Sequence, residues 1–225
     1  MNRIILLRHG ENRANLTKEF SYKKIDYPLT EKGILQARQT AEALRGRGIR
    51  AIYTSPLKRA QQTAQIVGES LGLTPILDEA FREFNVGRLE EVPPSNETWG
   101  QYHRVIHAWV EGRAEVSFPG GENNRQLWAR YESGLRKVIQ AHPGQTLLIV
   151  GHGGIFTATL PQLCPDVAIL DLFKTENHNA SLTEIDVEMQ NGQLWGHLVS
   201  WAGIDHLSGE AAQFVSGTPR RGELP

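Results

Sequence analysis

Two short apolar runs, residues 4–7 and 147–150, stand out along the chain because polar residues and glycine follow each of them at once. Both runs are too short for an ordinary helix and lack helical spacing, so they predict strands buried on both faces. Two weaker runs of the same kind cover residues 51–54 and 76–77. The chain therefore has at least four candidate strands for the interior of a sheet.

Between these strands, apolar positions spaced three and four residues apart predict helices. Thr30 is a plausible N-cap for one helix, and Ser55-Pro56 combines a capping serine with a proline at the first helical position for another. Asn191-Gly192, between two strand-like segments, predicts a β-hairpin. Residues 11–28 are polar and irregular. The expected helices cover approximately residues 30–46, 55–72, 96–112, 122–141 and 153–164.

The alternation of strand and helix is typical of an α/β fold. We therefore expect a three-layer α/β/α architecture with a mostly parallel central sheet, helices on both faces and a small helical lid inserted at about residues 92–120. A single domain is predicted over residues 1–202. Residues 203–225 are rich in glycine, serine, proline and charge, and are expected to form a loosely attached tail.

Composition narrows the classes of partner. The 225 residues carry 24 basic and 25 acidic side chains, so the net charge of −1 gives no reason to expect nucleic acid or a membrane as a partner. The single cysteine, Cys164, excludes an intramolecular disulfide and a multi-cysteine metal site. With no signal-peptide pattern and no long apolar run, the sequence predicts a cytoplasmic protein.

Side chains suited to binding phosphate follow the predicted strands. Arg8 and His9 come directly after the first strand, Arg59 lies in the first turn of the helix after the second, and His152 follows residues 147–150. Because the carboxyl ends of parallel strands meet at one edge of a sheet, these groups are expected to converge. Guanidinium groups match phosphoryl oxygens in a fork, and the nearby helix N-termini direct N–H groups toward the same place.

Such a site could transfer a phosphoryl group. His9 can act as a nucleophile through one neutral ring nitrogen, and Glu83, between two phenylalanines, can be a carboxylic acid of raised pKa. Glu83 would protonate the leaving alkoxide and afterwards activate water. Each group also has a purely structural interpretation: Arg59 as a solvated cation, Glu83 in a surface ion pair, and His152 as a helix cap.

Together, the segments that carry these groups resemble the histidine phosphatase superfamily, in its phosphoglycerate-mutase-like branch, over roughly residues 3–200. The resemblance implies a phosphohistidine on His9, Glu83 as proton donor, and no metal or other cofactor. It also implies a phosphate pocket of Arg8, Arg59 and His152, with Asn15 and Gly153 nearby. The matching motifs are Leu7-Arg8-His9-Gly10-Glu11 with Asn15, Ser55–Ala64, the Glu83 segment and Gly151-His152-Gly153-Gly154.

Departures from the family pattern bear on the substrate. Mutases of this family tend to have tryptophan where Ala14 stands, and they carry a lysine- and tyrosine-containing insert that is missing from this sequence. The phosphatase pattern after Glu83 is matched by Gly87 and Glu90, but Glu91 replaces its last glycine. The turn at residues 119–122 resembles a loop that borders the pocket in many relatives, with a weaker link of its glutamate to substrate.

The function expected from these features is hydrolysis of a small organic phosphate by a phosphomonoesterase. A phosphoglycerate-type mutase and a non-catalytic phospho-ligand-binding scaffold are the alternatives. The aromatic residues between Trp99 and Trp109 would either contact a ringed alcohol or simply pack the lid onto the sheet. The expected partner is a small phosphate ester, and the protein is expected to be a monomer or a homodimer.

Overall fold

Six strands form one sheet in the computed structural model, which describes residues 1–219 and 224. The strand order is β3-β2-β4-β1-β5-β6; the first four strands are parallel, β5 is antiparallel to β1, and β6 is antiparallel to β5. This mostly parallel sheet confirms the predicted α/β class. The strands are β1 Asn2–Arg8, β2 Ile49–Thr54, β3 Ile76–Leu77, β4 Thr146–Gly151, β5 Leu182–Gln190 and β6 Gln193–Gly203.

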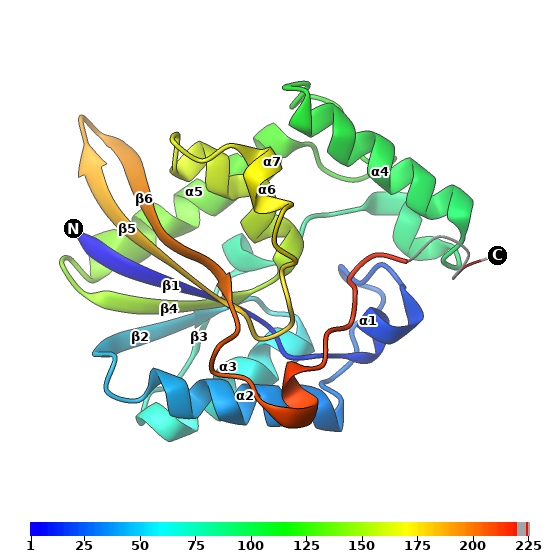
Figure 1. Ribbon diagram of the computed structural model, residues 1–225. Coiled ribbons are helices and arrows are strands. Elements are labelled where there is room, and N and C mark those ends of the chain that lie inside the picture. Colours follow the sequence, from blue (N-terminus) through cyan, green and yellow to red (C-terminus); the bar gives the residue numbers. More distant parts are fainter. Residues whose placement is uncertain (220–223, 225) are drawn as a thin grey trace.

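Helices cover both faces of the sheet. Figure 1 shows α2 and α3 on one side and α5 and α6 on the other. Alternate residues of β1 face the two layers: Ile5 and Leu7 pack with α2 and α3, whereas Ile4 and Leu6 pack with α5 and α6. The helices are α1 Arg13–Thr17, α2 Glu31–Leu44, α3 Lys58–Leu71, α4 Asn96–Val110, α5 Asn124–Ala141, α6 Gly153–Leu163 and α7 Ile169–Leu172, with 3₁₀ turns η1 Glu79–Phe81, η2 Gly87–Glu91 and η3 Gly209–Ala212.

The parallel strands end level with one another. In the register of β1, β4 and β2, Val150 lies opposite both Leu7 and Thr54. The residues that follow these three strands therefore emerge side by side, as the sequence predicts. No helix in the described part of the chain is long and apolar enough to cross a membrane.

Two of the predicted helix starts have different outcomes. Thr30 caps α2 as predicted, accepting a hydrogen bond from the Gly33 amide at 3.1 Å. The prediction that Ser55 caps the next helix is wrong, because α3 begins only at Lys58. The Ser55 hydroxyl instead lies 2.7 Å from Nε2 of His152. The irregular stretch predicted at residues 11–28 also contains the short helix α1, which the Asn12 side chain caps.

The hairpin is confirmed: Asn191 and Gly192 join β5 to β6 with φ angles of 49° and 80°. These left-handed values suit the primed two-residue turns.

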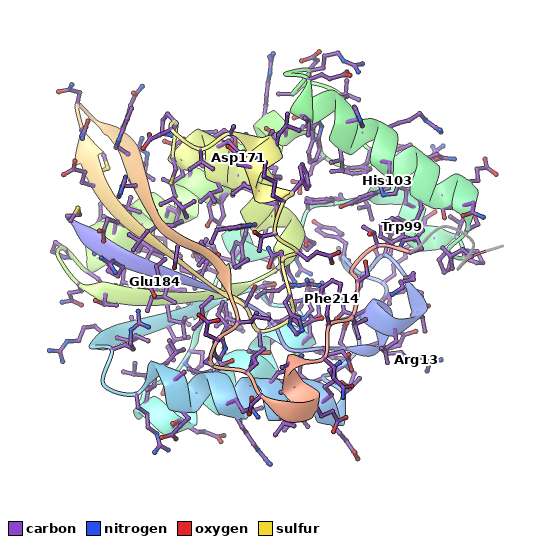
Figure 2. The ribbon with its side chains drawn as sticks, viewed as in Figure 1. Arg13, Trp99, His103, Asp171, Glu184 and Phe214 are labelled. Carbon is purple, nitrogen blue, oxygen red and sulfur yellow. The ribbon has the colours of Figure 1, made fainter. Side chains whose placement is uncertain are left out.

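The segment after β6 packs against the domain. Leu207 and Ala211 are buried in the core beside α2, and the Gln36 side chain donates to the Ala211 carbonyl at 3.0 Å. The ring of Phe214, labelled in Figure 2, lies 5.5 Å from that of His178. Residues 204–212 of the expected tail are thus packed onto the domain, whereas residues 220–223 and 225 of that tail lie outside the described part. Leu207 and Ala211, together with the partly buried Ile204 and Ala212, attach this segment to the core.

Candidate active site

A cavity of about 420 Å³ opens at the carboxyl ends of the parallel strands. Six of the seven site residues predicted from the sequence line it. The seventh, His152, is fully buried beneath them, with its ring 5.1 Å from that of His9. The six lining residues are Arg8, His9, Asn15, Arg59, Glu83 and Gly153.

The ring of His9 is fixed at both nitrogens. Nδ1 lies 2.7 Å from the Gly10 carbonyl, which can only accept, so Nδ1 carries the proton. The lone pair of Nε2 accepts a hydrogen bond from Nε of Arg59 at 3.0 Å. Burial, and then the Arg59 and Arg8 guanidiniums, lower the pKa of His9 well below its usual value. His9 is therefore a neutral imidazole whose free lone pair lies on Nε2.

The turn that carries His9 is built on close backbone contact. A Cβ on Gly10 would lie 2.4 Å from the Gly33 carbonyl oxygen, and a Cβ on Gly33 would lie 2.1 Å from the Glu11 carbonyl oxygen. Only glycine fits at either position. The first turn of α2 thus lies directly against the main chain behind the imidazole.

Two buried guanidiniums flank His9. Burial lowers the pKa of both Arg8 and Arg59 to about 10, so both remain charged at neutral pH. Arg59 donates to the hydroxyl and carbonyl of Ser21 at 2.8 and 2.9 Å. Arg8 donates to the Asn177 carbonyl, but its buried Nε–H has no partner in the described structure. Arg59 is therefore not a solvated surface cation.

His152 lies at the N-cap of α6 but makes no capping hydrogen bond, so the capping interpretation is wrong. Burial, and then the charge of Arg59, lower its pKa well below the usual value. Nε2 is bonded to Ser55, whereas the buried Nδ1 has no partner among the described residues. An unsatisfied nitrogen next to the cavity is a group that a ligand could satisfy.

The carboxyl of Glu83 lies at the N-terminus of α6. Its oxygens accept hydrogen bonds from the amides of Gly154 at 2.9 Å, Ile155 at 2.7 Å and Phe84 at 3.0 Å. Burial raises the pKa of Glu83 despite these amides and Arg59, which favour the charged form. The surface ion pair suggested for Glu83 does not form, because Arg82 pairs with Glu79 instead.

A partly buried ion pair, which the sequence analysis missed, holds the Glu83 segment in place. Arg130 of α5 donates to the Glu83 carbonyl at 3.1 Å and forms a 2.8 Å ion pair with Glu122. Glu122 in turn accepts from the Asn85 amide at 2.8 Å. Glu122 does not line the cavity, so it supports the Glu83 segment through Arg130 and the Asn85 amide. Arg130 sits amid an ordinary amphipathic helix, and no sequence pattern singled it out.

A second carboxylate orders the loop above Arg59. One oxygen of the buried Glu90 accepts hydrogen bonds from four successive amides at 2.7–3.0 Å. Ser21, which holds Arg59, directly precedes these amides. The sequence marked Glu90 only as a match to a family pattern. The four donors are the amides of Tyr22, Lys23, Lys24 and Ile25.

Asn15 lies at the edge of the cavity as part of a small amide network. Its Oδ1 accepts from the Asn12 amide and from Nδ2 of Asn179, both at 3.1 Å. Asn179, which sequence reasoning missed, also donates to the His9 carbonyl at 3.1 Å. Asn15 is therefore tied to the backbone of the His9 turn.

A doubly covered, mostly parallel sheet with a neutral imidazole between two guanidiniums at its carboxyl edge defines the histidine phosphatase class of α/β proteins. The sequence model of the histidine phosphatase superfamily (branch 1) matches residues 4–198. The chain belongs to this family.

Individual relatives carry both mutase and phosphatase names. The chain is 32% identical over 208 residues to the probable phosphoglycerate mutase GpmB of Yersinia pestis (strain Pestoides F), covering 90% of this chain and 93% of the relative. It is similar to a mycobacterial glucosyl-3-phosphoglycerate phosphatase at TM-score 0.77 and 25% identity, covering 91% and 100% of the two chains. It also resembles Bacillus stearothermophilus YhfR at TM-score 0.74 and 27% identity, covering 92% and 99%.

Proposed function

We propose that the protein is a phosphomonoesterase that hydrolyses a small organic phosphate through a phosphohistidine on His9. Arg8, Arg59 and His152 bind the phosphoryl oxygens, and the Gly153 amide at the start of α6 adds a donor. Nε2 of His9 attacks phosphorus while the ester P–O bond breaks. The protonated carboxyl of Glu83 gives its proton to the leaving alkoxide, so the alcohol departs neutral.

The second step returns the site to its starting state. Glu83, now a carboxylate, takes a proton from water as the water oxygen attacks phosphorus. The N–P bond breaks, inorganic phosphate leaves, and His9 is again a neutral imidazole. Little covalent activation is required, because alignment and charge neutralisation carry most of the catalysis in phosphoryl transfer.

The observation that carries the proposal is the fixed tautomer of His9. Its Nδ1 proton is engaged by the Gly10 carbonyl, so Nε2 is the nitrogen with a lone pair, and Nε2 faces Arg59 at 3.0 Å. When a phosphate enters, Arg59 can transfer this hydrogen bond to a phosphoryl oxygen, which frees the lone pair for attack. The Arg59 guanidinium would thus both attract the phosphate and occupy the Nε2 lone pair of His9 until the phosphate enters.

Rapid quenching of a reaction with ³²P-labelled ester tests the proposal. A phosphohistidine is stable in base and labile in acid, so we expect base-stable label on the wild-type protein and none on His9→Ala. His197→Ala is the matched control, since that imidazole is exposed on β6, far from the cavity. A protein that binds phosphate but hydrolyses neither p-nitrophenyl phosphate nor a panel of metabolites would be the non-catalytic scaffold instead.

A phosphoglycerate-type mutase is the second candidate, because the GpmB relative carries that name. A mutase returns the phosphoryl group to the product and must exclude water from the phosphohistidine. Supplying 3-phosphoglycerate with a trace of the bisphosphate separates the two. Efficient formation of 2-phosphoglycerate without release of inorganic phosphate would establish the mutase.

A further inference from the structure

The cavity extends well beyond the phosphate-binding groups, and its outer walls are apolar. One wall comes from α4, through Tyr102 and Ile106, and the other from α7, through Ile169 and the following Phe173. Phe173 is 52% exposed, so its ring is not used in packing the core. Figure 1 shows α4 and α7 on the same side of the molecule, over the carboxyl end of the sheet.

Outside the phosphate-binding and catalytic groups, the described charged residues that line the cavity have one sign. Among the described residues that line the cavity, the only cations are Arg8 and Arg59, and both lie at the phosphate end. The remaining charged lining residues outside the catalytic group are Glu19 and Glu176. Glu176 lies close enough to Arg8 to act on it through Coulombic attraction.

An organic group bound here is selected in two ways. An apolar or ringed group gains free energy by leaving water for the side chains of α4 and α7. A carboxylate on the same group would meet Glu19 and Glu176, with no cation among the described residues that line this end of the cavity, and it would lose hydration on entering.

We infer that the substrate is a phosphate monoester whose organic part is apolar or ringed and carries no carboxylate. This inference rests on the proposed phosphomonoesterase activity. It gives α4 the role of a specificity wall, with the aromatic side chains of that helix contacting the substrate as well as the core.

Two matched pairs of esters test the charge. Glycerol 3-phosphate and 3-phosphoglycerate differ in one carboxylate, as do phenyl phosphate and 3-carboxyphenyl phosphate. We expect kcat/KM to be about tenfold higher for the member of each pair that lacks the carboxylate. Solvent screens the repulsion between that carboxylate and the glutamates of the cavity, so the effect is modest. We also expect KM for phenyl phosphate to be about tenfold lower than KM for glycerol 3-phosphate, from burial of the ring.

Two variants assign these preferences to the walls. Glu176→Gln should raise the ratio of kcat/KM for 3-phosphoglycerate to that for glycerol 3-phosphate severalfold, whereas Glu188→Gln on β5 should not change it. Phe173→Ser should lower the preference for phenyl phosphate. Leu170→Ser is its control, because that side chain is 64% exposed on the same helix and does not line the cavity.

The outcomes separate the two proposals. If no ester is hydrolysed, the phosphomonoesterase itself is refuted. If esters are hydrolysed and the carboxylated members react as well as or faster than the neutral ones, only the inference about the organic group is overturned. A preference that persists unchanged in both Glu176→Gln and Phe173→Ser would also overturn it, because the walls would then not be its source.

Discussion

Glu90 offers a sharp test of how the phosphate site is supported, because its own side chain does not line the cavity. One of its two oxygens, Oε1, accepts four amide hydrogen bonds from the loop that begins at Ser21. Ser21 in turn accepts hydrogen bonds from two nitrogens of Arg59. Glu90→Gln keeps the shape and removes the charge. The substitution therefore asks whether an ordered loop is needed to present Arg59.

The size of the effect follows from the four bonds. A hydrogen bond to a charged group contributes roughly 1.5–3 kcal/mol and one between neutral groups roughly 0.5–1.5 kcal/mol. Because the four share one acceptor and are not additive, we expect a loss of about 2–4 kcal/mol in the stability of the loop. If about 1.4 kcal/mol of that loss reaches Arg59, KM for the ester and the inhibition constant for phosphate each rise about tenfold.

The assay is steady-state hydrolysis of p-nitrophenyl phosphate with competitive inhibition by inorganic phosphate. We expect KM and the inhibition constant to rise together, with a smaller change in kcat, and the thermal midpoint to fall. Glu91→Gln is the matched control, since that neighbouring side chain is half exposed and pairs with Lys24 of the same loop at 2.5 Å. If the two variants behave alike, Glu90 does not act through Arg59.

The remaining predictions concern Glu83 and the tail. Glu83→Gln should slow hydrolysis of glycerol 3-phosphate more than hydrolysis of p-nitrophenyl phosphate, because an activated leaving group needs less protonation. An equal loss of rate for both esters would show that Glu83 is not the acid. Because the pKa of Glu83 is raised, kcat/KM for poor leaving groups should fall as pH rises through that pKa, and Glu83→Gln should abolish this alkaline limb in a pH profile. The lowered pKa of His9 keeps the nucleophile neutral below pH 6.5, so the acidic limb should lie lower still. Leu207→Ala should lower the free energy of unfolding by about 2–3 kcal/mol in chemical denaturation; no loss would mean that the tail is not part of the core.

Much of the fold could be predicted because the interior strands are short and apolar. A run such as residues 4–7 is too apolar to face solvent, so it predicts an interior strand. The level ends of the strands then bring Arg8, His9 and His152 together, and this can be predicted without knowing any side-chain contact. Residues far apart in the sequence were placed correctly because the sheet, and not local structure, sets their distance.

The supporting groups could not be predicted in the same way. Arg130 and Glu90 act through hydrogen bonds to backbone carbonyls and amides, and any segment of the chain offers such partners. Ser55 was assigned to a helix cap because serine before proline commonly is one, but a bond to His152 took its place. The packing of the segment after β6 was missed for a related reason: Leu207 and Ala211 stand among many polar residues, and average composition does not single them out.

The pair of glycines behind the imidazole has a consequence for redesign. Because the backbones of Gly10 and Gly33 are in direct contact, the position of α2 sets the orientation of the His9 ring. Substitutions of side chains elsewhere in the cavity do not change this backbone contact. New substrates are therefore best sought by varying the walls on α4 and α7, because substitutions there leave the position of His9 Nε2 unchanged.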